Sequence, residues 1–275
     1  MATVKFGNAK IFKPTTLMKY LSFFVLMLLA DTSLAQVNGD LTIPKNKTYV
    51  LDFNSSLLQF NAWSFGVSDY NYIFNGYFTN QGKGFVSRIE TVPLNYRETL
   101  KGGFMSSINV SDDMFMFTKR KVTGLLPNTE YRATFQVQIA TKAGRNCVGV
   151  GGAPGEDVTL KAGATGVEPL SVPVFSFGGG VYSIDYRMNI DKGDQRIGGK
   201  EMIVLGDIAG TSTNCIDNKR YELKELASTE AVSVKTNWLG EAWVIVGTDS
   251  GYEGETSLYI TKVTADFKIP LYVLY

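Results

Sequence analysis

The chemistry open to this chain is limited first by a residue type that it lacks, because its 275 residues include no histidine. Histidine is the usual general base near neutral pH and the commonest protein ligand of zinc. Its absence removes every Ser-His and Cys-His nucleophile pair. Catalysis that needs such a pair is therefore excluded, and no zinc site is expected.

Carboxylates are the remaining reactive groups, and they gather in short loops that also carry glycine. In the clearest of these loops, Asp249 and Glu253 stand beside Gly251 and Gly254. Calcium takes about six to eight oxygen ligands in irregular geometry, and glycine lets the backbone fold two carboxylates toward one point. We predict a calcium ion at Asp249 and Glu253, with solvated, turn-forming acidic residues as the alternative.

Aromatic residues in polar, glycine-bearing segments form the second candidate set. Flat rings presented to solvent can stack on the apolar C–H faces of sugars while neighbouring Asn, Asp or Arg reaches the hydroxyls. Packing in the core or at its rim is the alternative for each ring. The candidate ligand-binding residues are Trp63, Tyr70, Tyr72 and Trp238.

The glycine-rich segment 147–164, CVGVGGAPGEDVTLKAGA, tests whether the chain could bind a nucleotide. A dinucleotide fingerprint needs a third glycine where Pro154 stands, and a phosphate loop needs Gly-Lys-Ser/Thr where Gly155 is followed by Glu156 and Asp157. We therefore interpret the glycines as turn residues before a strand and expect no nucleotide cofactor.

Cys147 and Cys215 are the only cysteines of the chain. An isolated pair in an exported protein more often forms a disulfide than a metal or redox site, which would need C-x-x-C spacing or histidine support. We predict that Cys147 and Cys215 are joined, with two free thiols as the alternative.

The elements that must position these residues are predicted to be strands. In Tyr131–Ile139, aromatic and aliphatic residues alternate with Arg, Thr and Gln, which is typical of a strand buried on one face. Short β-rich runs recur along the chain and no repeat of fixed period is visible. Only residues 221–227 fit a helix as well as a strand. We predict an all-β protein, a single jelly-roll-like β-sandwich of antiparallel strands over residues 36–275.

The first 35 residues are expected to be a signal peptide outside this domain. Four lysines precede the apolar run 20–30, and Ser33 and Ala35 are small residues at the positions that determine cleavage. The run is shorter than the roughly 20 residues needed to cross a bilayer. We expect export to the periplasm or the extracellular space and no transmembrane segment in the mature chain. The near balance of 27 basic and 26 acidic residues argues against a nucleic-acid partner.

Three stretches carry a resemblance to known proteins: residues 111–137, 147–156 and 247–263. Together they resemble a family of uncharacterised exported bacterial proteins, some of which are lipoproteins. Trp63, the segment 122–137 and the closing strand also resemble jelly-roll carbohydrate-binding modules of the galactose-binding type. Thr261 stands where those modules often bear an aspartate, so the resemblance does not carry over a calcium site.

These observations predict a secreted or periplasmic binding protein, non-catalytic, whose ligand is a carbohydrate or a glycan of the cell envelope. A structural or adhesive envelope protein that binds other proteins through sheet edges is the alternative. A histidine-free glycan hydrolase or lyase comes third, since glycosidases need only two carboxyl groups at a suitable separation.

Overall fold

The computed structural model describes residues 46–54, 63–74, 78–80, 82–94, 99–110, 113–216 and 220–270; in the strands between 72 and 83 it describes backbone pairing but not side chains. The chain divides into compact units at residues 1–42 and 43–275, and the first unit lies outside the described residues, as does the predicted signal peptide. Every regular element of the described residues is a β-strand, and the paired strands are antiparallel, which confirms the all-β class.

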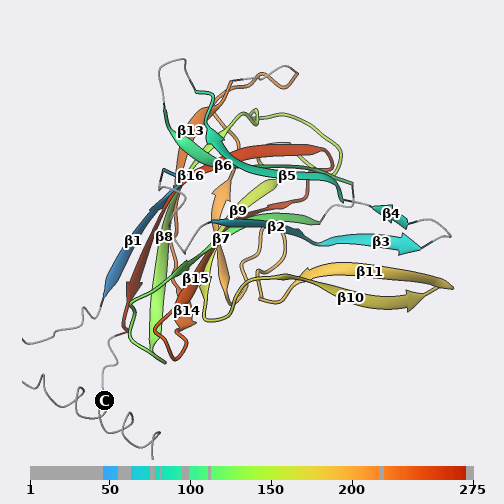
Figure 1. Ribbon diagram of the computed structural model, residues 1–275. Helices are drawn as coiled ribbons and strands as arrows, with labels where there is room; N and C mark the ends of the chain where they lie inside the picture. The colour runs from blue at the N-terminus through green and yellow to red at the C-terminus, as the bar shows by residue number, and fades with distance from the viewer. Residues whose placement is uncertain are drawn as a thin grey trace, which may run out of the picture. The chain divides into compact units, whose positions relative to one another are not determined.

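Two sheets form the sandwich (Figure 1). The seven-stranded sheet has the order β13-β8-β16-β6-β5, with β1 paired to β16 and β14 paired to β8, and the five-stranded sheet has the order β12-β9-β15-β7-β2. The strands of the first are β1 (Lys47–Asp52), β5 (Gly82–Thr91), β6 (Lys101–Asn109), β8 (Glu130–Thr141), β13 (Glu222–Ala227), β14 (Val232–Lys235) and β16 (Glu255–Lys268). Those of the second are β2 (Ser64–Ser68), β7 (Met114–Val122), β9 (Val158–Thr165), β12 (Met202–Asp207) and β15 (Ala242–Ser250).

The core between the two sheets follows from period-two alternation. Tyr131, Phe135 and Ile139 of β8 point inward with 0 to 3% of their surface exposed, and they pack with Leu160 of β9 and Val244 of β15. Alternation therefore predicted the buried face of β8 correctly.

The outer face of the five-stranded sheet is also covered. Ile190 and Met202 pack there against Phe115, Phe117 and Ile245, so the segment that leads from β11 to β12 lies over this face. This covering segment buries polar residues as well as apolar ones, and these polar residues belong to the charged site described below.

A third sheet of four strands completes the structure, with the order β10-β11-β3-β4. Its strands are β3 (Tyr70–Phe74), β4 (Phe78–Asn80), β10 (Ser171–Gly178) and β11 (Val181–Met188). In Figure 1, β3, β10 and β11 run side by side away from the sandwich strands. The sequence analysis did not predict this sheet. Within the ambiguous residues 221–227, Glu222–Ala227 form strand β13, because β8 offers them an edge to pair with.

Candidate functional site

The β10–β11 hairpin carries the aromatic residues of the third sheet and is closed by glycine. Gly179 and Gly180 connect the strands with φ angles of 58° and 80°. A two-residue hairpin turn needs positive φ at both positions, and glycine adopts it without steric cost. The turn thereby sets the register in which Phe177 pairs with Tyr182.

One face of this sheet is aromatic. Residues two apart on a strand share a face, so the described side chains form three rows: Pro173–Tyr186–Tyr70 at the root, Phe175–Ile184 in the middle, and Phe177–Tyr182 near the turn. Phe175 is 76% exposed, Phe177 63% and Tyr182 64%. Three large rings thus stand in solvent on one flat surface, which marks this face as a candidate binding surface.

Contacts between aromatic rings occur at both ends of the aromatic face. The rings of Tyr70 and Tyr186 stack with centroids 4.7 Å apart and planes 6° from parallel. The rings of Phe177 and Tyr182 lie 4.6 Å apart at 39°. Since each pair comes from neighbouring strands, the sheet itself sets the spacing of the rings.

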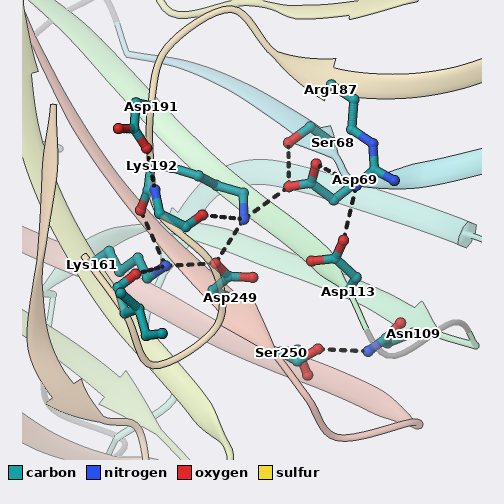
Figure 2. A network of polar contacts seen from close by, with 12 residues as sticks. Ser68, Asp69, Asn109, Asp113, Lys161, Arg187, Asp191, Lys192, Asp249 and Ser250 are labelled. Atoms are coloured by element: carbon teal, nitrogen blue, oxygen red, sulfur yellow. Dashed lines mark hydrogen bonds and ion pairs between the residues drawn. The ribbon is translucent and has the colours of Figure 1, made fainter. Parts of the chain in front are cut away.

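A charged cluster lies at the root of the same sheet, beneath the segment that follows β11 (Figure 2). Asp249 on β15 is fully buried, and its Oδ2 lies 2.7 Å from Nζ of Lys161 and 2.8 Å from Nζ of Lys192. Lys192 also lies 3.1 Å from Oδ2 of Asp69. Arg187 extends the cluster on the exposed side.

The shifted pKa values follow from this burial. Desolvation lowers the pKa of Lys161, and Asp249 offsets only part of that shift. Desolvation also acts on Lys192, but two carboxylates, Asp249 and Asp69, together raise its pKa. Asp113 lies 2.9 Å from Arg187. Its pKa is raised to about 6, first by desolvation and then by the charge of Asp69.

Beside this cluster is an open depression of about 340 Å³, lined in part by Asp69, Asp113, Arg187, Lys192 and Asp194. Within the described residues, no group of three or more Asp, Glu, His or Cys side chains is arranged to hold a metal ion. The cluster anchors the segment after β11 to the five-stranded sheet through ion pairs between distant parts of the chain.

The structure shows different neighbours for the two predicted calcium ligands. Asp249 faces Lys161 and Lys192, whereas the backbone N–H of Glu253 donates to the carbonyl of Val150. Oδ1 of Asp249 is buried and accepts no hydrogen bond from any described residue. The calcium site stays a prediction.

The predicted aromatic ligands are divided between the core and two surfaces. Trp63 is 8% exposed and stacks on Phe53 with centroids 4.8 Å apart, while its Nε1 donates to the carbonyl of Asp52. Its expected ligand contact is therefore corrected to a core contact, because a buried ring offers no free face. Tyr70 belongs to the aromatic face. Tyr72 pairs with Ile184, but its side chain lies outside the described residues.

Trp238 lies in the turn between β14 and β15 and is 73% exposed. The preceding residue, Asn237, lines a groove of about 560 Å³ together with Thr165, Lys200, Lys235 and others. None of the described residues lining this groove belongs to the third sheet. The predicted aromatic ligands thus mark two separate surfaces.

The disulfide prediction is confirmed: Cys147 and Cys215 are bonded, with Cα atoms 5.5 Å apart. The bond ties the glycine-rich loop to the segment before β13. In that loop, Glu156 accepts from the backbone N–H of Asn146 and Asp157 pairs with Arg196. These contacts give the loop's carboxylates structural partners.

Sequence reasoning missed Phe175, Phe177 and Tyr182, which are the most exposed rings among the described side chains of the aromatic face. A signal for them is present in residues 171–188, SVPVFSFGGGVYSIDYRM, where alternating aromatics flank three glycines. That pattern predicts a hairpin with one aromatic face. It could not show that the face stays uncovered, because exposure depends on what the rest of the chain packs against.

Among known proteins, only solved structures match this chain. No protein-family model and no curated protein matches the chain, so the resemblance to an uncharacterised exported family stays a prediction. Solved structures similar to it include a carbohydrate-binding module that recognises mannan, with 10% identity, a TM-score of 0.35, and coverage of 80% of this chain and 97% of that chain. Another is the family 11 carbohydrate-binding module of a Clostridium thermocellum cellulosomal cellulase, with 10% identity, a TM-score of 0.33, and coverage of 83% and 98%.

The enzymatically active domain of tailspike protein 4 of bacteriophage CBA120 is also similar, with 9% identity, a TM-score of 0.27, and coverage of 81% of this chain and 19% of that chain. Likenesses with TM-scores this low carry no argument about this chain. No helix among the described residues is long and apolar enough to span a bilayer.

Proposed function

We propose that this is an exported, non-catalytic binding protein that holds a glycan on the aromatic face of its third sheet. The observation that carries the proposal is the uncovered row of Phe175, Phe177 and Tyr182 on one face of the β10–β11 hairpin. Aromatic rings in this arrangement offer a flat apolar surface that matches the C–H face of a sugar ring.

The carboxylates of the charged cluster have structural partners. Asp69, Asp113 and Asp249 each lie within 3.2 Å of a lysine or arginine side chain, and the proposal gives these ion pairs a role in anchoring the fold. Because the pKa of Asp113 is raised to about 6, release of reducing sugar is the measurement that tests the non-catalytic role.

The test compares variants within one strand. The side chain of Phe175 lies on the aromatic face, while that of Val174, 46% exposed, lies on the reverse face of the same strand. On an array of neutral, acidic and envelope glycans, Phe175→Ala should weaken binding about tenfold, because a largely exposed ring is lost from the contact. Val174→Ala should bind as the unaltered protein does.

Trp238→Ala separates the two aromatic surfaces. If Trp238→Ala abolishes glycan binding while Phe175→Ala leaves it unchanged, the ligand lies at the groove beside Asn237 and the proposed location is wrong. Release of reducing sugar from any bound polysaccharide would contradict the non-catalytic role.

A protein partner is the second candidate, favoured by β10 being an edge strand. Among the described strands, β10 pairs only with β11, so its other edge has backbone groups that a partner strand could bind. Binding to an envelope protein that persists in Phe175→Ala, with no glycan bound, would favour this candidate.

Export is part of the proposal and has its own test. Cleavage after Ala35 makes Gln36 the first residue of the mature protein. N-terminal sequencing of protein recovered from the periplasm or medium should begin there.

A further inference from the structure

The aromatic face carries no ionisable group other than tyrosine at its described positions. We infer that its ligand is a neutral glycan chain, bound across several rings at once, rather than an acidic polysaccharide or a single sugar. This inference rests on the proposed function, and it names the class of ligand within it.

The absence of charge follows from the alternation of β10 and β11. In β10, residues 171–178 include no Asp, Glu, Lys or Arg. In β11, Asp185 and Arg187 alternate with Tyr182, Ile184 and Tyr186, so the charged side chains fall on the reverse face. An acidic ligand on the aromatic face would lose hydration with no cation to pair with.

The charged groups nearest the root are already engaged with one another. Arg187 lies 3.2 Å from Oδ1 of Asp69 and 2.9 Å from Oδ2 of Asp113. Lys192 is 8% exposed and bridges Asp69 and Asp249. A ligand carboxylate could recruit Lys192 only by breaking buried ion pairs, which costs more than a surface ion pair returns. Arg187 is half exposed, but by alternation it lies on the reverse face of β11, away from the aromatic face.

The dimensions of the face favour a chain over a monosaccharide. Residues advance about 3.4 Å along a strand, so Pro173 and Phe177 are separated by roughly 14 Å. Neighbouring strands add about 4.8 Å of width each. One sugar ring covers about one aromatic ring, so three rows of side chains can contact successive sugars.

A lipid surface is the main competing occupant of exposed phenylalanines. Peripheral membrane-binding surfaces combine apolar residues with lysine and arginine, which attract anionic headgroups. Residues 171–186 include no basic side chain. The lack of basic side chains therefore favours a neutral hydroxylated ligand over an anionic lipid surface, and binding to anionic vesicles is an outcome that the test must check.

The experiment takes the best neutral glycan from the array and measures its affinity by calorimetry. The ligand is tested at increasing length, from the monosaccharide to a chain of about six units. The longest chain is also tested after oxidation, which gives it carboxylates. We expect the dissociation constant to fall at least about tenfold along the series, because successive rings add contacts. Salt between about 0.05 and 0.5 M should change it less than twofold, since no ion pair forms.

Variants locate the effect on the rings. Phe177→Ala and Tyr182→Ala should reduce the gain from chain length, whereas Ser183→Ala, on the reverse face of β11, should not. Tighter binding of the oxidised chain, strong salt dependence, or equal affinity for the monosaccharide would overturn the inference and leave glycan binding standing. Binding to anionic vesicles but to no glycan would overturn both.

Discussion

Replacing Asp249 with asparagine removes the one carboxylate that two buried lysines share. Lys161 is fully buried and would keep only the carbonyl oxygens of Lys192 and Ile197, at 3.1 and 2.9 Å. Lys192 would keep Asp69. The substitution therefore leaves a fully buried ammonium group at Lys161 without a carboxylate in direct contact, although the charges of Asp191 and Asp194 still act on it.

The geometry sets the size of the effect. At 2.7 Å and an effective dielectric constant of about 20, the Lys161–Asp249 attraction is about 6 kcal/mol. Desolvation of Asp249 offsets several kcal/mol of this in the native protein. We expect a net loss of about 3 to 5 kcal/mol in the free energy of unfolding, which lowers the melting temperature by about 10 °C.

Urea unfolding at neutral pH measures this loss, and its pH dependence identifies the cause. Burial already lowers the pKa of Lys161, and without Asp249 that pKa falls further. The unfolded lysine keeps its ordinary pKa, so the unfolded state binds more protons and stability rises with pH. The variant should therefore recover part of its loss by about pH 9.

Two controls make the reasoning refutable. Lys200→Met removes an exposed ammonium group that lies 3.8 Å from Glu201, and should change stability by less than about 0.5 kcal/mol. Lys161→Met combined with Asp249→Asn removes the unpaired charge and should cost less than the sum of the single changes. A loss below about 1 kcal/mol in Asp249→Asn, or strict additivity in the double variant, would refute the reasoning.

The remaining predictions concern the disulfide, Asp113 and calcium. Cys147→Ala with Cys215→Ala opens a loop with a sequence separation of 68 and should lower the unfolding free energy by roughly 4 kcal/mol; an unchanged urea midpoint would contradict this. The raised pKa of Asp113, about 6, contributes stability that is complete below its ordinary value of 3.8 and is lost as pH rises through about 6. Asp113→Asn should therefore lose less stability than the unaltered protein between these pH values, and equal losses would argue against the shift. If Asp249 and Glu253 bind calcium, the melting temperature should be higher in excess calcium than in chelator. At a hundredfold excess over the dissociation constant, the expected gain in the free energy of unfolding is about 2.7 kcal/mol. Equal melting temperatures in the two conditions would leave Asp249 solely an ion-pair partner.

The sequence alone determined the all-β class and the disulfide, because both depend on patterns that neighbouring structure hardly alters. The alternation in Tyr131–Ile139 is typical of a strand with one buried face. The structure has a strand there, since β8 runs from Glu130 to Thr141. Two cysteines without other partners leave one possible intrachain pairing. The absence of histidine likewise bounds the chemistry whatever the fold.

Only the tertiary structure decided which side chains are partners and which are exposed. Asp249 and Lys161 are 88 residues apart, and they meet because β15 pairs with β9 while the segment after β11 covers both. Trp63 and Phe175 are both aromatic residues followed by a serine in the sequence, yet the first is 8% exposed and the second 76%. Burial depends on long-range packing, and a local pattern of residue types does not show which distant segments of the chain cover a side chain.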